Sequence, residues 1–354
     1  MEESETIVIL GAGIIGLDVA LVLSERGYGR YVTVKAEYLP GDSAGTYTSP
    51  WAGCNFSAIS GSNPNELKWD RLGYAHLTKL ASERPDEAFV QRTPSTEMWD
   101  EEVPYSKIEA MSEYLEDFHV LPESQLPKGV KHAVSFTTVT INAPKHMEYL
   151  YRRLRDQYGV RFVRQRVSSL QDAFANPATR VAFNCTGNAS RSLPGVEDHK
   201  CYPTRGQVVL CRAPRVTSNI MRHGRDYETY VIPRPGSNGN VILGGYMQRR
   251  NSDCATYSYE TKSILDRTRE LSSEVCQEEV EILAAFAGLR PSRDGGARIE
   301  RENISVAGET RIVVHNYGAG GTGFQAGYGM AWEAVRSVED VLRQLKNLHP
   351  RPRM

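Results

Sequence analysis

The stretch TIVILGAGIIG occupies residues 6–16 and places a glycine-rich loop directly after a short apolar run. Residues 17–26 follow with apolar side chains at the i, i+3 and i+4 spacing of one helix face, and Gly27 ends that pattern. Residues 31–36 form a second run rich in β-formers. This order predicts a strand–helix–strand unit, with the loop at the turn between the first strand and the helix.

The loop has the dinucleotide-binding pattern Gly11-x-Gly13-x-x-Gly16 in its expected context. Gly11 permits the tight turn, Gly13 lets the backbone approach a pyrophosphate, and Gly16 lets the helix pack against the strand. The first N–H groups of the helix then face the phosphates, and Glu37 at the end of the second strand accepts hydrogen bonds from a ribose. A chance glycine triplet in a turn is the alternative. The pattern alone does not separate FAD from NAD.

Length and composition restrict the class of protein. The chain has 354 residues, of which 40% are hydrophobic and 24% are charged, and its net charge is −1. This length fits one large domain or two interleaved domains, and the small net charge gives no field that attracts nucleic acid or an anionic membrane. No run of 18 apolar residues predicts a membrane span, and the acidic start MEESE lacks the features of a signal peptide.

The six cysteines form no C-x-x-C pair, and the eight histidines show no metal-ligand spacing. We therefore expect reduced structural thiols in an intracellular compartment, and no metal site.

Strand–helix patterns recur at three separated places. Residues 144–158 and 160–163 are predicted as helix and strand, residues 180–184 as a strand, and residues 311–315 and 324–345 as the final strand and helix. Antiparallel strands are predicted at residues 206–211, 227–233 and 241–245, a long loop at 41–63, and helices at 65–83 and 257–271. This arrangement predicts a discontinuous nucleotide domain with a second domain threaded through it.

A second glycine-rich loop, HNYGAGGTG, lies at residues 315–323 between a strand and a helix. Its N–H groups predict another anion site at a helix N-terminus. Two such loops fit a two-ended ligand, one at the pyrophosphate and one at the flavin edge, where negative charge appears on reduction. A glycine hinge is the alternative. Cys185-Thr186-Gly187 after a strand is a further candidate contact, although a purely structural turn explains it as well.

Two residues are candidates for binding a carboxylate. Arg290 stands between Leu289 and Pro291, outside any run of charges, and a guanidinium matches a carboxylate with two parallel hydrogen bonds. An interdomain salt bridge of Arg290 is the alternative. Tyr230 in the stretch YVIP could donate its hydroxyl to the same carboxylate, although a lone strand tyrosine is more often a core residue.

Taken as a whole, the chain resembles the D-amino-acid oxidase family. The matching motifs are ILGAGIIGL at 9–17, SPWAGCN at 49–55, NCTG at 184–187, RGQVVL at 205–210, YVIPRPG at 230–236, LGGY at 243–246, GLRP at 288–291 and HNYGAGGTGFQ at 315–325. They cover nearly the whole chain, and their order and spacing match the family. The family includes D-aspartate oxidase and, more distantly, glycine and sarcosine oxidases.

The resemblance implies an α/β fold with a Rossmann-like FAD-binding domain of the glutathione-reductase type. An interleaved α+β substrate domain is expected on a mixed, largely antiparallel sheet. The FAD domain is expected at residues 1–56, 144–192 and 286–354, and the substrate domain at 57–143 and 193–285. FAD is expected without a covalent link. Asp18 departs from the small serine usual in the family, but a carboxylate just inside a helix start suits the dipole, so no loss of fold is expected.

The resemblance also assigns roles to single residues. The catalytic set that it implies is Tyr230, Arg290, Gly321 and Gln325. The substrate-binding set is Asn55, Ile59, Arg222, Tyr230, Tyr246, Met247 and Arg290, and it stays open whether Tyr246 or Met247 takes the place of a second family tyrosine. The FAD-binding set is Gly11, Ala12, Gly13, Ile14, Ile15, Gly16, Glu37, Tyr38, Ser49, Ala52, Gly53, Val167, Cys185, Thr186, Gly187, Arg290, Gly318, Gly320, Gly321, Thr322, Gly323, Phe324 and Gln325.

The implied reaction is hydride transfer from Cα of a D-amino acid to flavin N5, with Arg290 and Tyr230 orienting the carboxylate. The imino acid hydrolyses to a 2-oxo acid and ammonia, and dioxygen reoxidises the flavin with release of hydrogen peroxide. No general base is nominated. An NAD-dependent dehydrogenase and a non-catalytic flavin-binding protein are the alternatives. The second glycine loop argues against the first, and the pair Arg290 and Tyr230 argues against the second.

The preferred side chain of the substrate depends on a loop before Tyr230. Arg222 falls close to where D-aspartate oxidases carry an arginine, which favours acidic substrates. The alternative is that Arg222 and Arg225 face water, and Met247 departs from the basic residue of those enzymes. We expect a broad range of neutral D-amino acids, with acidic ones as the runner-up.

The last three residues, Pro352-Arg353-Met354, resemble a degenerate form of a peroxisomal address. A peroxisomal location is therefore expected, with the cytoplasm as the alternative. The small-molecule partners expected are a D-amino acid and dioxygen. An import receptor and a second copy in a homodimer are the candidate protein partners.

Overall fold

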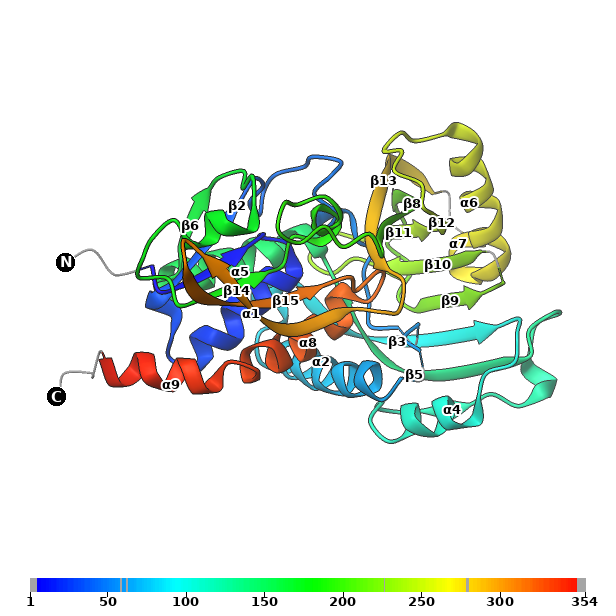
Figure 1. Cartoon of the computed structure of the whole chain (residues 1–354). Coiled ribbons are helices and arrows are strands. Elements are labelled where there is room, and N and C mark those ends of the chain that lie inside the picture. The colour runs from blue at the N-terminus through cyan, green and yellow to red at the C-terminus, as the bar shows by residue number, and fades with distance from the viewer. Residues whose placement is uncertain (1–4, 58, 62, 226, 278–279, 349–354) are drawn as a thin grey trace.

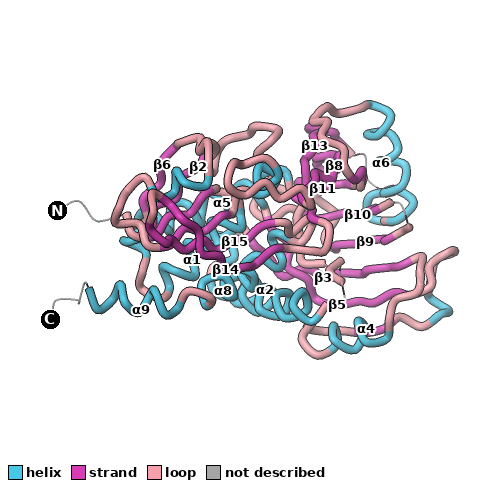
Figure 2. Tube along the Cα trace, in the orientation of Figure 1, coloured by secondary structure: helices cyan, strands magenta, loops and turns pink. Residues whose placement is uncertain are grey.

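The computed structural model describes residues 5–57, 59–61, 63–225, 227–277 and 280–348, and its strands form two sheets side by side along the molecule (Figure 1). The acidic residues 1–4 and the tripeptide Pro352-Arg353-Met354 lie outside the described residues. Figure 2 shows that helices surround the first sheet, whereas the second sheet has long strands with fewer helices.

The first sheet carries the predicted strand–helix–strand unit. Within the described chain its six strands follow the order β14 (Arg298–Val306), β15 (Glu309–Tyr317), β7 (Val181–Asn184), β1 (Ile7–Leu10), β2 (Val32–Ala36) and β6 (Arg161–Arg164). Neighbours from β15 to β6 are parallel, and β14 is antiparallel to β15. Strands β1, β2 and β7 are buried along their whole length, as in parallel sheets covered on both faces.

Helices from distant parts of the chain pack together beside this sheet. They are α1 (Ile14–Glu25), α2 (Pro64–Glu83), α5 (Ala143–Tyr158), α8 (Gly323–Arg336) and α9 (Glu339–Leu348). Helix α1 contacts both α5 and α8, and α8 contacts α2. The last contact is close, because a side chain at Gly73 of α2 would overlap the backbone carbonyl of Gln325.

The second sheet is mixed and largely antiparallel. Its path in the described chain is β12 (Gln248–Arg249), β8 (Cys201–Arg212), β11 (Asn240–Gly244), β10 (Glu228–Pro233), β9 (Asn219–His223), β3 (Val90–Trp99), β5 (His132–Ile141) and β4 (His119–Val120), with β13 (Glu281–Arg293) also paired to β8. Among the described strands of this sheet, the pair β3–β9 is parallel and the other pairs are antiparallel.

One face of this sheet is closed by helix α6 (Ser258–Leu271) and the short helix α7 (Ser273–Cys276). Ile264 of α6 and Val275 of α7 share a core with Val209, Val231 and Leu243 of the strands. Helix α4 (Tyr105–Ser112) packs at the other end of the sheet, and α3 (Pro85–Ala88) follows α2. Short 3-10 turns occupy Gly29–Tyr31, Ser49–Trp51, Glu123–Gln125, Leu170–Phe174 and Gly187–Arg191.

The predicted fold class is confirmed, with a Rossmann-like parallel sheet joined to a mixed, largely antiparallel one. The expected single closing helix is wrong, because it divides into α8 and α9 on either side of residues 337–338. The sequence does not predict β3, β4, β5, β9, β12, β13 or β14. The loop expected before Tyr230 is wrong in part, because β9 occupies residues 219–223 there. Strand β13 runs through residue 286, where a domain boundary was expected, and the residue limits of the two domains remain a prediction.

Candidate active site

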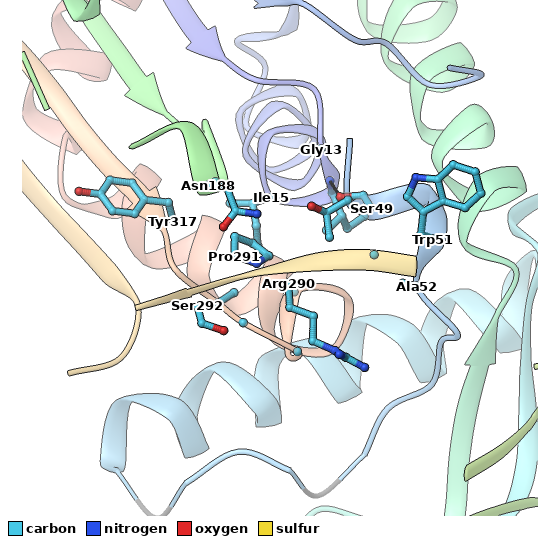
Figure 3. Close-up of a pocket in the computed structure, with 18 of the residues that line it drawn as sticks. Gly13, Ile15, Ser49, Trp51, Ala52, Asn188, Arg290, Pro291, Ser292 and Tyr317 are labelled. Atoms are coloured by element: carbon cyan, nitrogen blue, oxygen red, sulfur yellow. Dashed lines mark hydrogen bonds between the residues drawn. The ribbon is translucent and has the colours of Figure 1, made fainter. Parts of the chain in front are cut away.

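A cavity of about 1340 Å³ lies where the two sheets meet, and residues from both line it. Figure 3 shows Gly13, Ile15 and Ser49 from the N-terminal part of the chain close to Asn188, Arg290 and Pro291. The wall therefore joins the first glycine loop near Gly11 to the segment that ends at Gln325, at opposite ends of the chain. This volume exceeds what a small amino acid alone would fill.

The first glycine loop forms one end of the cavity. Gly11 has a φ of 101°, and a Cβ there would lie 2.5 Å from the carbonyl oxygen of Cys185. A Cβ at Gly16 would overlap the carbonyl of Gly11, so Gly16 allows α1 to pack beneath the loop. Gly16 itself is not among the residues that line the cavity. Its contact with the cofactor stays a prediction, and its close approach to the Gly11 carbonyl shows a packing role.

The N-terminus of α1 opens into the cavity. Its N-cap residue, Gly13, provides no side-chain cap, and its first turn contains no acidic residue. Ser49 Oγ accepts a hydrogen bond from the N–H of Ile14 at 3.1 Å. The remaining N–H groups of the first turn and the positive end of the helix dipole suit a phosphate.

The end of β2 supplies the second part of the cavity wall. Glu37 lines the cavity with its side chain 45% exposed, and Arg166 Nε lies 3.9 Å from its carboxylate. The ring of Tyr38 stacks on Tyr47 with 5.7 Å between centroids, and the Tyr47 hydroxyl donates to the carbonyl of Ala12 at 2.6 Å. These contacts fix the position of the strand end that carries Glu37 relative to the first glycine loop.

The second glycine loop reaches the cavity from β15. Gly318 and Gly320 have φ values of 86° and 58°, which favour glycine. The N–H of Gly320 donates to the carbonyl of Pro291 at 2.8 Å, which ties the loop to β13. Thr322 is the N-cap of α8, but its hydroxyl donates to the carbonyl of Ala319 instead of capping the helix. A second uncapped helix N-terminus therefore faces the cavity.

These features fit FAD. Both glycine loops line the cavity, and both lead into helices whose N-cap residues make no side-chain cap hydrogen bond. The predicted FAD-binding residues that line the cavity are Gly11, Ala12, Gly13, Ile14, Ile15, Glu37, Tyr38, Ser49, Ala52, Gly53, Val167, Cys185, Thr186, Gly187, Arg290, Gly318, Gly320, Gly321, Thr322, Gly323, Phe324 and Gln325.

Arg290 extends from β13 into the cavity (Figure 3). Its Nη1 donates to the carbonyl of Tyr246 at 3.1 Å, and its Nη2 donates to the Tyr230 hydroxyl at 3.4 Å. Gly206 provides the space for the guanidinium, which a Cβ there would overlap. No carboxylate of the described residues forms an ion pair with Arg290, so the interdomain salt bridge is not seen.

Tyr230 is both buried and part of the cavity wall. Burial raises the pKa of its hydroxyl, and the positive charge of Arg290 lowers it in part. The group is therefore a hydrogen-bond donor at neutral pH. Arg290 and Tyr230 together present donors to an anion from one side of the cavity.

Of the two candidates after the LGG turn, Met247 lines the cavity and Tyr246 does not. The structure thus favours Met247 for the pocket position that the sequence leaves open between the two residues. Its ring packs near the α6 core, with Arg267 Cζ 5.4 Å from the ring centroid. Only the carbonyl of Tyr246 reaches Arg290. Met247 is 42% exposed at the cavity rim.

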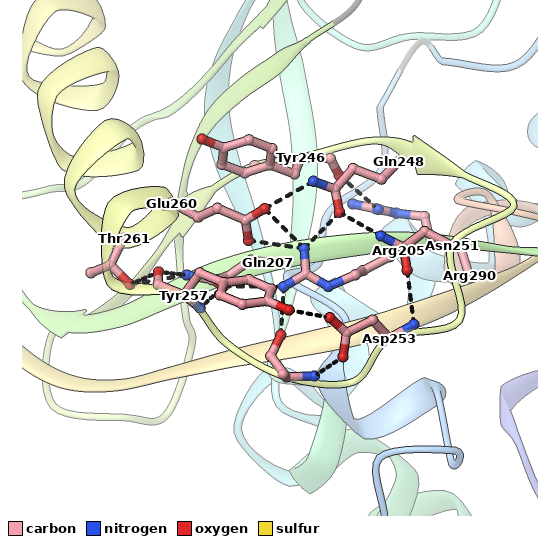
Figure 4. Close-up of polar contacts among 12 residues, drawn as sticks. Arg205, Gln207, Tyr246, Gln248, Asn251, Asp253, Tyr257, Glu260, Thr261 and Arg290 are labelled. Carbon is pink, nitrogen blue, oxygen red and sulfur yellow. Dashed lines mark hydrogen bonds and ion pairs between the residues drawn. The ribbon is translucent and has the colours of Figure 1, made fainter.

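A buried ion pair holds this segment from behind (Figure 4). Arg205 and Glu260 are both fully buried, with Nη1 and Oε2 2.9 Å apart. Gln248 accepts from Arg205 at 2.7 Å and donates to Glu260 at 2.9 Å. Gln207 donates to the carbonyl of Tyr257 at 2.9 Å. Arg205 of the RGQ motif thus anchors Gln248, the residue that follows Met247.

Arg222 is not among the residues that line the cavity, although the resemblance places it in the substrate pocket. Its Nε donates to Asp100 at 2.9 Å and its Nη2 to the carbonyl of Lys128 at 3.2 Å. The neighbouring Arg225 does line the cavity, with an exposed side chain. The sequence predicts only a water-facing position for Arg225.

The remaining predicted pocket residues, Asn55 and Ile59, line the cavity. Asn55 Nδ2 donates to the carbonyl of Phe56 at 3.1 Å and lies 3.2 Å from Met221 Sδ. Ile59 is 37% exposed, and a Cβ at Gly321 would lie 3.2 Å from its Cδ1. The two residues therefore lie on walls that meet the second glycine loop.

Gln325 connects the cavity to buried polar residues. Its Oε1 accepts from the N–H of Ser57 at 3.2 Å, and its Nε2 donates to Ser60 and to Asp70, both at 3.0 Å. Burial raises the pKa of Asp70 to about 6, against hydrogen bonds from Ser60 and Gln325 that lower it. The sequence gave no signal for Asp70, which lies in an ordinary helical pattern.

Sequence reasoning also missed His223 and its two carboxylates. His223 Nδ1 lies 2.6 Å from Glu228 Oε2, and its Nε2 lies 3.1 Å from Glu97 Oε2. Glu228 lines the cavity. His223 and Glu228 lie at the two-residue spacing of one strand face from cavity residues of β9 and β10. Glu97 comes from a strand that is far away in the sequence, so alternation along one strand does not pair it with them.

Several other classes of site find no counterpart among the described residues. No group of three or more His, Cys, Asp or Glu side chains is arranged to hold a metal ion. No described helix is long and apolar enough to cross a bilayer. All six cysteines are free, and the buried Cys54 and Cys185 line the cavity.

Comparison with known proteins identifies similar chains over this whole length. A model of the family "FAD dependent oxidoreductase" matches residues 6–336. The D-amino-acid oxidase of Schizosaccharomyces pombe is 43% identical, over 93% of this chain and 94% of that protein. A D-aspartate oxidase of Cryptococcus neoformans var. grubii is 30% identical, over 95% and 97%. The glycine oxidase of Bacillus cereus is 18% identical with a TM-score of 0.71, over 94% and 97%, which shows a shared fold.

Proposed function

This chain belongs to the family of FAD-dependent oxidoreductases, and on that premise we propose that it oxidises D-amino acids with dioxygen as the electron acceptor. The products are a 2-oxo acid, ammonia and hydrogen peroxide, with one water consumed. The observation that carries the proposal is the guanidinium of Arg290 beside the Tyr230 hydroxyl in the cavity, next to the second glycine loop.

The residues of the chain bind and orient the substrate. Arg290 and Tyr230 hold the carboxylate, so that a D-amino acid presents its Cα–H in one direction. FAD, when bound, supplies the acceptor for the hydride and passes both electrons to dioxygen. Gly321 leaves room at the edge of the second loop, and Gln325 is fixed from behind by Ser60 and Asp70. The imino acid product then takes up water and releases ammonia.

The same proposal covers the FAD contacts. The α1 and α8 N-termini would hold the pyrophosphate and the flavin edge, and Glu37 would accept from the ribose. The family membership removes support for an NAD-dependent dehydrogenase.

The test is peroxide release from the FAD-loaded protein across a panel of D-amino acids, with the L-forms as controls. We expect peroxide from neutral D-amino acids and none from their L-forms. Flavin-loaded protein that releases no peroxide with any D-amino acid would instead support the non-catalytic flavin-binding alternative.

A second candidate is a preference for acidic D-amino acids. Arg225 at the cavity wall favours it, and one relative is named a D-aspartate oxidase. Arg222, the residue on which the sequence argument relied, is occupied by Asp100. We therefore keep neutral substrates as the first expectation, and the ratio of D-Asp to D-Ala turnover decides between them.

For location and assembly we propose import into peroxisomes through Pro352-Arg353-Met354 and a homodimer in solution. Fluorescently tagged protein with and without these three residues tests the first. Light scattering coupled to gel filtration tests the second. A cytoplasmic signal for both tagged forms, or a monomer mass, would contradict the respective proposal.

A further inference from the structure

A carboxylate occupies the cavity wall close to the proposed carboxylate-binding pair. Glu228 begins β10, and Tyr230 follows two residues later, so both side chains lie on the same face of the strand. Both line the cavity. The Glu228 side chain is only 13% exposed, which removes it from most of the screening by bulk water.

The position of Glu228 is fixed by a buried histidine. His223 is its partner in the β9–β10 register, with Nδ1 2.6 Å from Glu228 Oε2. On its other side, His223 Nε2 lies 3.1 Å from the fully buried Glu97, which also accepts from Ser57 Oγ at 3.1 Å. Burial disfavours the charged imidazole, but hydrogen bonds to the two carboxylates outweigh it and raise the pKa of His223 to about 9.

One oxygen of the Glu228 carboxylate keeps its capacity to accept a hydrogen bond at the cavity wall. Two carboxylates share one imidazolium, and Glu228 Oε1 accepts no hydrogen bond from the residues that the structure describes. Lys107 is a further cation near Glu97 and Glu228, half-buried on α4 and not part of the cavity wall. The free oxygen of Glu228 is therefore the acceptor that a ligand in the cavity meets.

The spacing places Glu228 at the side chain of the substrate and not at its amino group. Two residues along a strand span about 7 Å, so Glu228 lies roughly that far from Tyr230. The α-amino group is separated from the bound carboxylate by a single carbon and stays near Arg290. The N–H of Gly245 donates to the carbonyl of Glu228 at 2.9 Å, which puts Glu228 beside the turn that leads to the exposed Met247 at the rim.

We propose that Glu228, held by His223, forms a side-chain subsite that selects D-amino acids with a cationic side chain, such as D-lysine, and disfavours acidic ones. This inference rests on the proposed D-amino-acid oxidation. Arg225 does not cancel it, because its exposed charge is hydrated at the rim, whereas the Glu228 carboxylate is mostly buried.

The first measurement uses ligands that cannot be oxidised, and the FAD-loaded wild-type protein. 6-Aminohexanoate has the carbon chain and terminal amine of lysine without its α-amino group, and hexanoate lacks the terminal amine as well. Their affinities are read from the change in the visible absorbance of the bound flavin. We expect 6-aminohexanoate to bind about tenfold more tightly than hexanoate, which a single charge-assisted hydrogen bond provides. Equal or weaker binding would overturn the subsite.

The second measurement compares kcat/KM for D-Lys, D-Met and D-Glu in the wild type and in Glu228→Gln. The amide keeps a hydrogen-bond acceptor for His223 and removes the charge. We expect the D-Lys to D-Met ratio to fall about tenfold and the D-Glu to D-Met ratio to rise. A proportional loss for all three substrates would show that Glu228 only supports the fold, and would contradict the proposal.

Glu97→Gln is the matched control, because it removes a carboxylate from the same histidine without touching the cavity. We expect its D-Lys to D-Met ratio to stay within about threefold of the wild type, since only the distant field changes. An equal loss in both variants would overturn direct contact. If no D-amino acid is oxidised, the proposed function fails, and the 6-aminohexanoate comparison still decides whether the subsite exists.

Discussion

At the residue scale, Arg290 is the proposed ligand of the substrate carboxylate. Its two terminal nitrogens donate to neutral partners, so its positive charge stays available for an anion. Arg290→Ala removes the cation but leaves both glycine loops intact. We expect KM to rise by on the order of 100-fold, since a charge-assisted pair is lost, while flavin remains bound. Steady-state kinetics and the flavin-to-protein absorbance ratio check this. Unchanged KM would exclude Arg290 as the carboxylate ligand.

Gly206 offers an independent test of the same arrangement. A Cβ at this position would overlap the Arg290 guanidinium, whose side-chain end can move. Gly206→Ala should therefore raise KM in the same direction as Arg290→Ala, by about tenfold, because the guanidinium is displaced and not removed. Gly288→Ala is the matched control, since its Cβ would lie 3.3 Å from Trp51 Cβ and away from Arg290. An equal effect in both variants would assign the loss to general distortion.

Asp18 behaves differently from the sequence-based expectation of a carboxylate that stabilises the helix dipole. It is buried in α1, and burial raises its pKa well above the ordinary 3.8, with a further contribution from Glu25. The folded state therefore holds a proton that the unfolded chain releases near pH 3.8. The stability that this proton contributes is present below 3.8 and is lost as pH rises toward the folded pKa.

Asp18→Asn removes that titration while keeping the size of the side chain. We expect the unfolding free energy of the variant to increase relative to that of the wild type as pH rises above about 4. Urea unfolding at a series of pH values measures it. A difference that is constant with pH would show that Asp18 has an ordinary pKa.

At the element scale, Arg205 of the RGQ motif in β8 anchors Gln248, which directly follows Met247 (Figure 4). Glu260→Ala leaves Arg205 buried without its carboxylate. We expect a loss of about 3–5 kcal/mol in unfolding free energy, which is the usual cost of breaking a buried pair. Glu281→Ala, which breaks an exposed pair with Arg212 of the same strand, should cost less than about 1 kcal/mol. Similar losses in the two variants would contradict this difference.

Elements were predictable from the sequence where the pattern is local. The strand and loop at residues 7–16 and the final glycine loop follow from short apolar runs and glycine spacing, and the structure has them there. Strand β13 was missed because its residues 281–293 pair with β8 about 80 residues earlier, and only two of its residues are buried. Likewise, Asp70 and Glu97 reach the cavity network only through tertiary packing, which spacing along the chain does not encode.

At the scale of the whole molecule, the cavity joins two sheets, so a ligand that fills it should stabilise both together. We expect added FAD to raise the thermal midpoint of the flavin-free protein in one cooperative transition. FMN lacks the adenosine end and should give a smaller shift. Differential scanning calorimetry with each ligand measures this, and equal shifts for FAD and FMN would contradict a role for the Glu37 end of the cavity.

The two cysteines in the cavity wall affect how well the protein resists oxidation. Burial raises the pKa of both Cys54 and Cys185 well above the ordinary thiol value, so neither is a thiolate at neutral pH. Peroxide attacks the thiolate form, so these two thiols would resist the peroxide that the proposed reaction releases. The exposed Cys254 and Cys276 do not line the cavity, and we expect oxidation during turnover to modify them before the buried pair. Loss of activity by oxidation should therefore lag behind modification of the surface thiols.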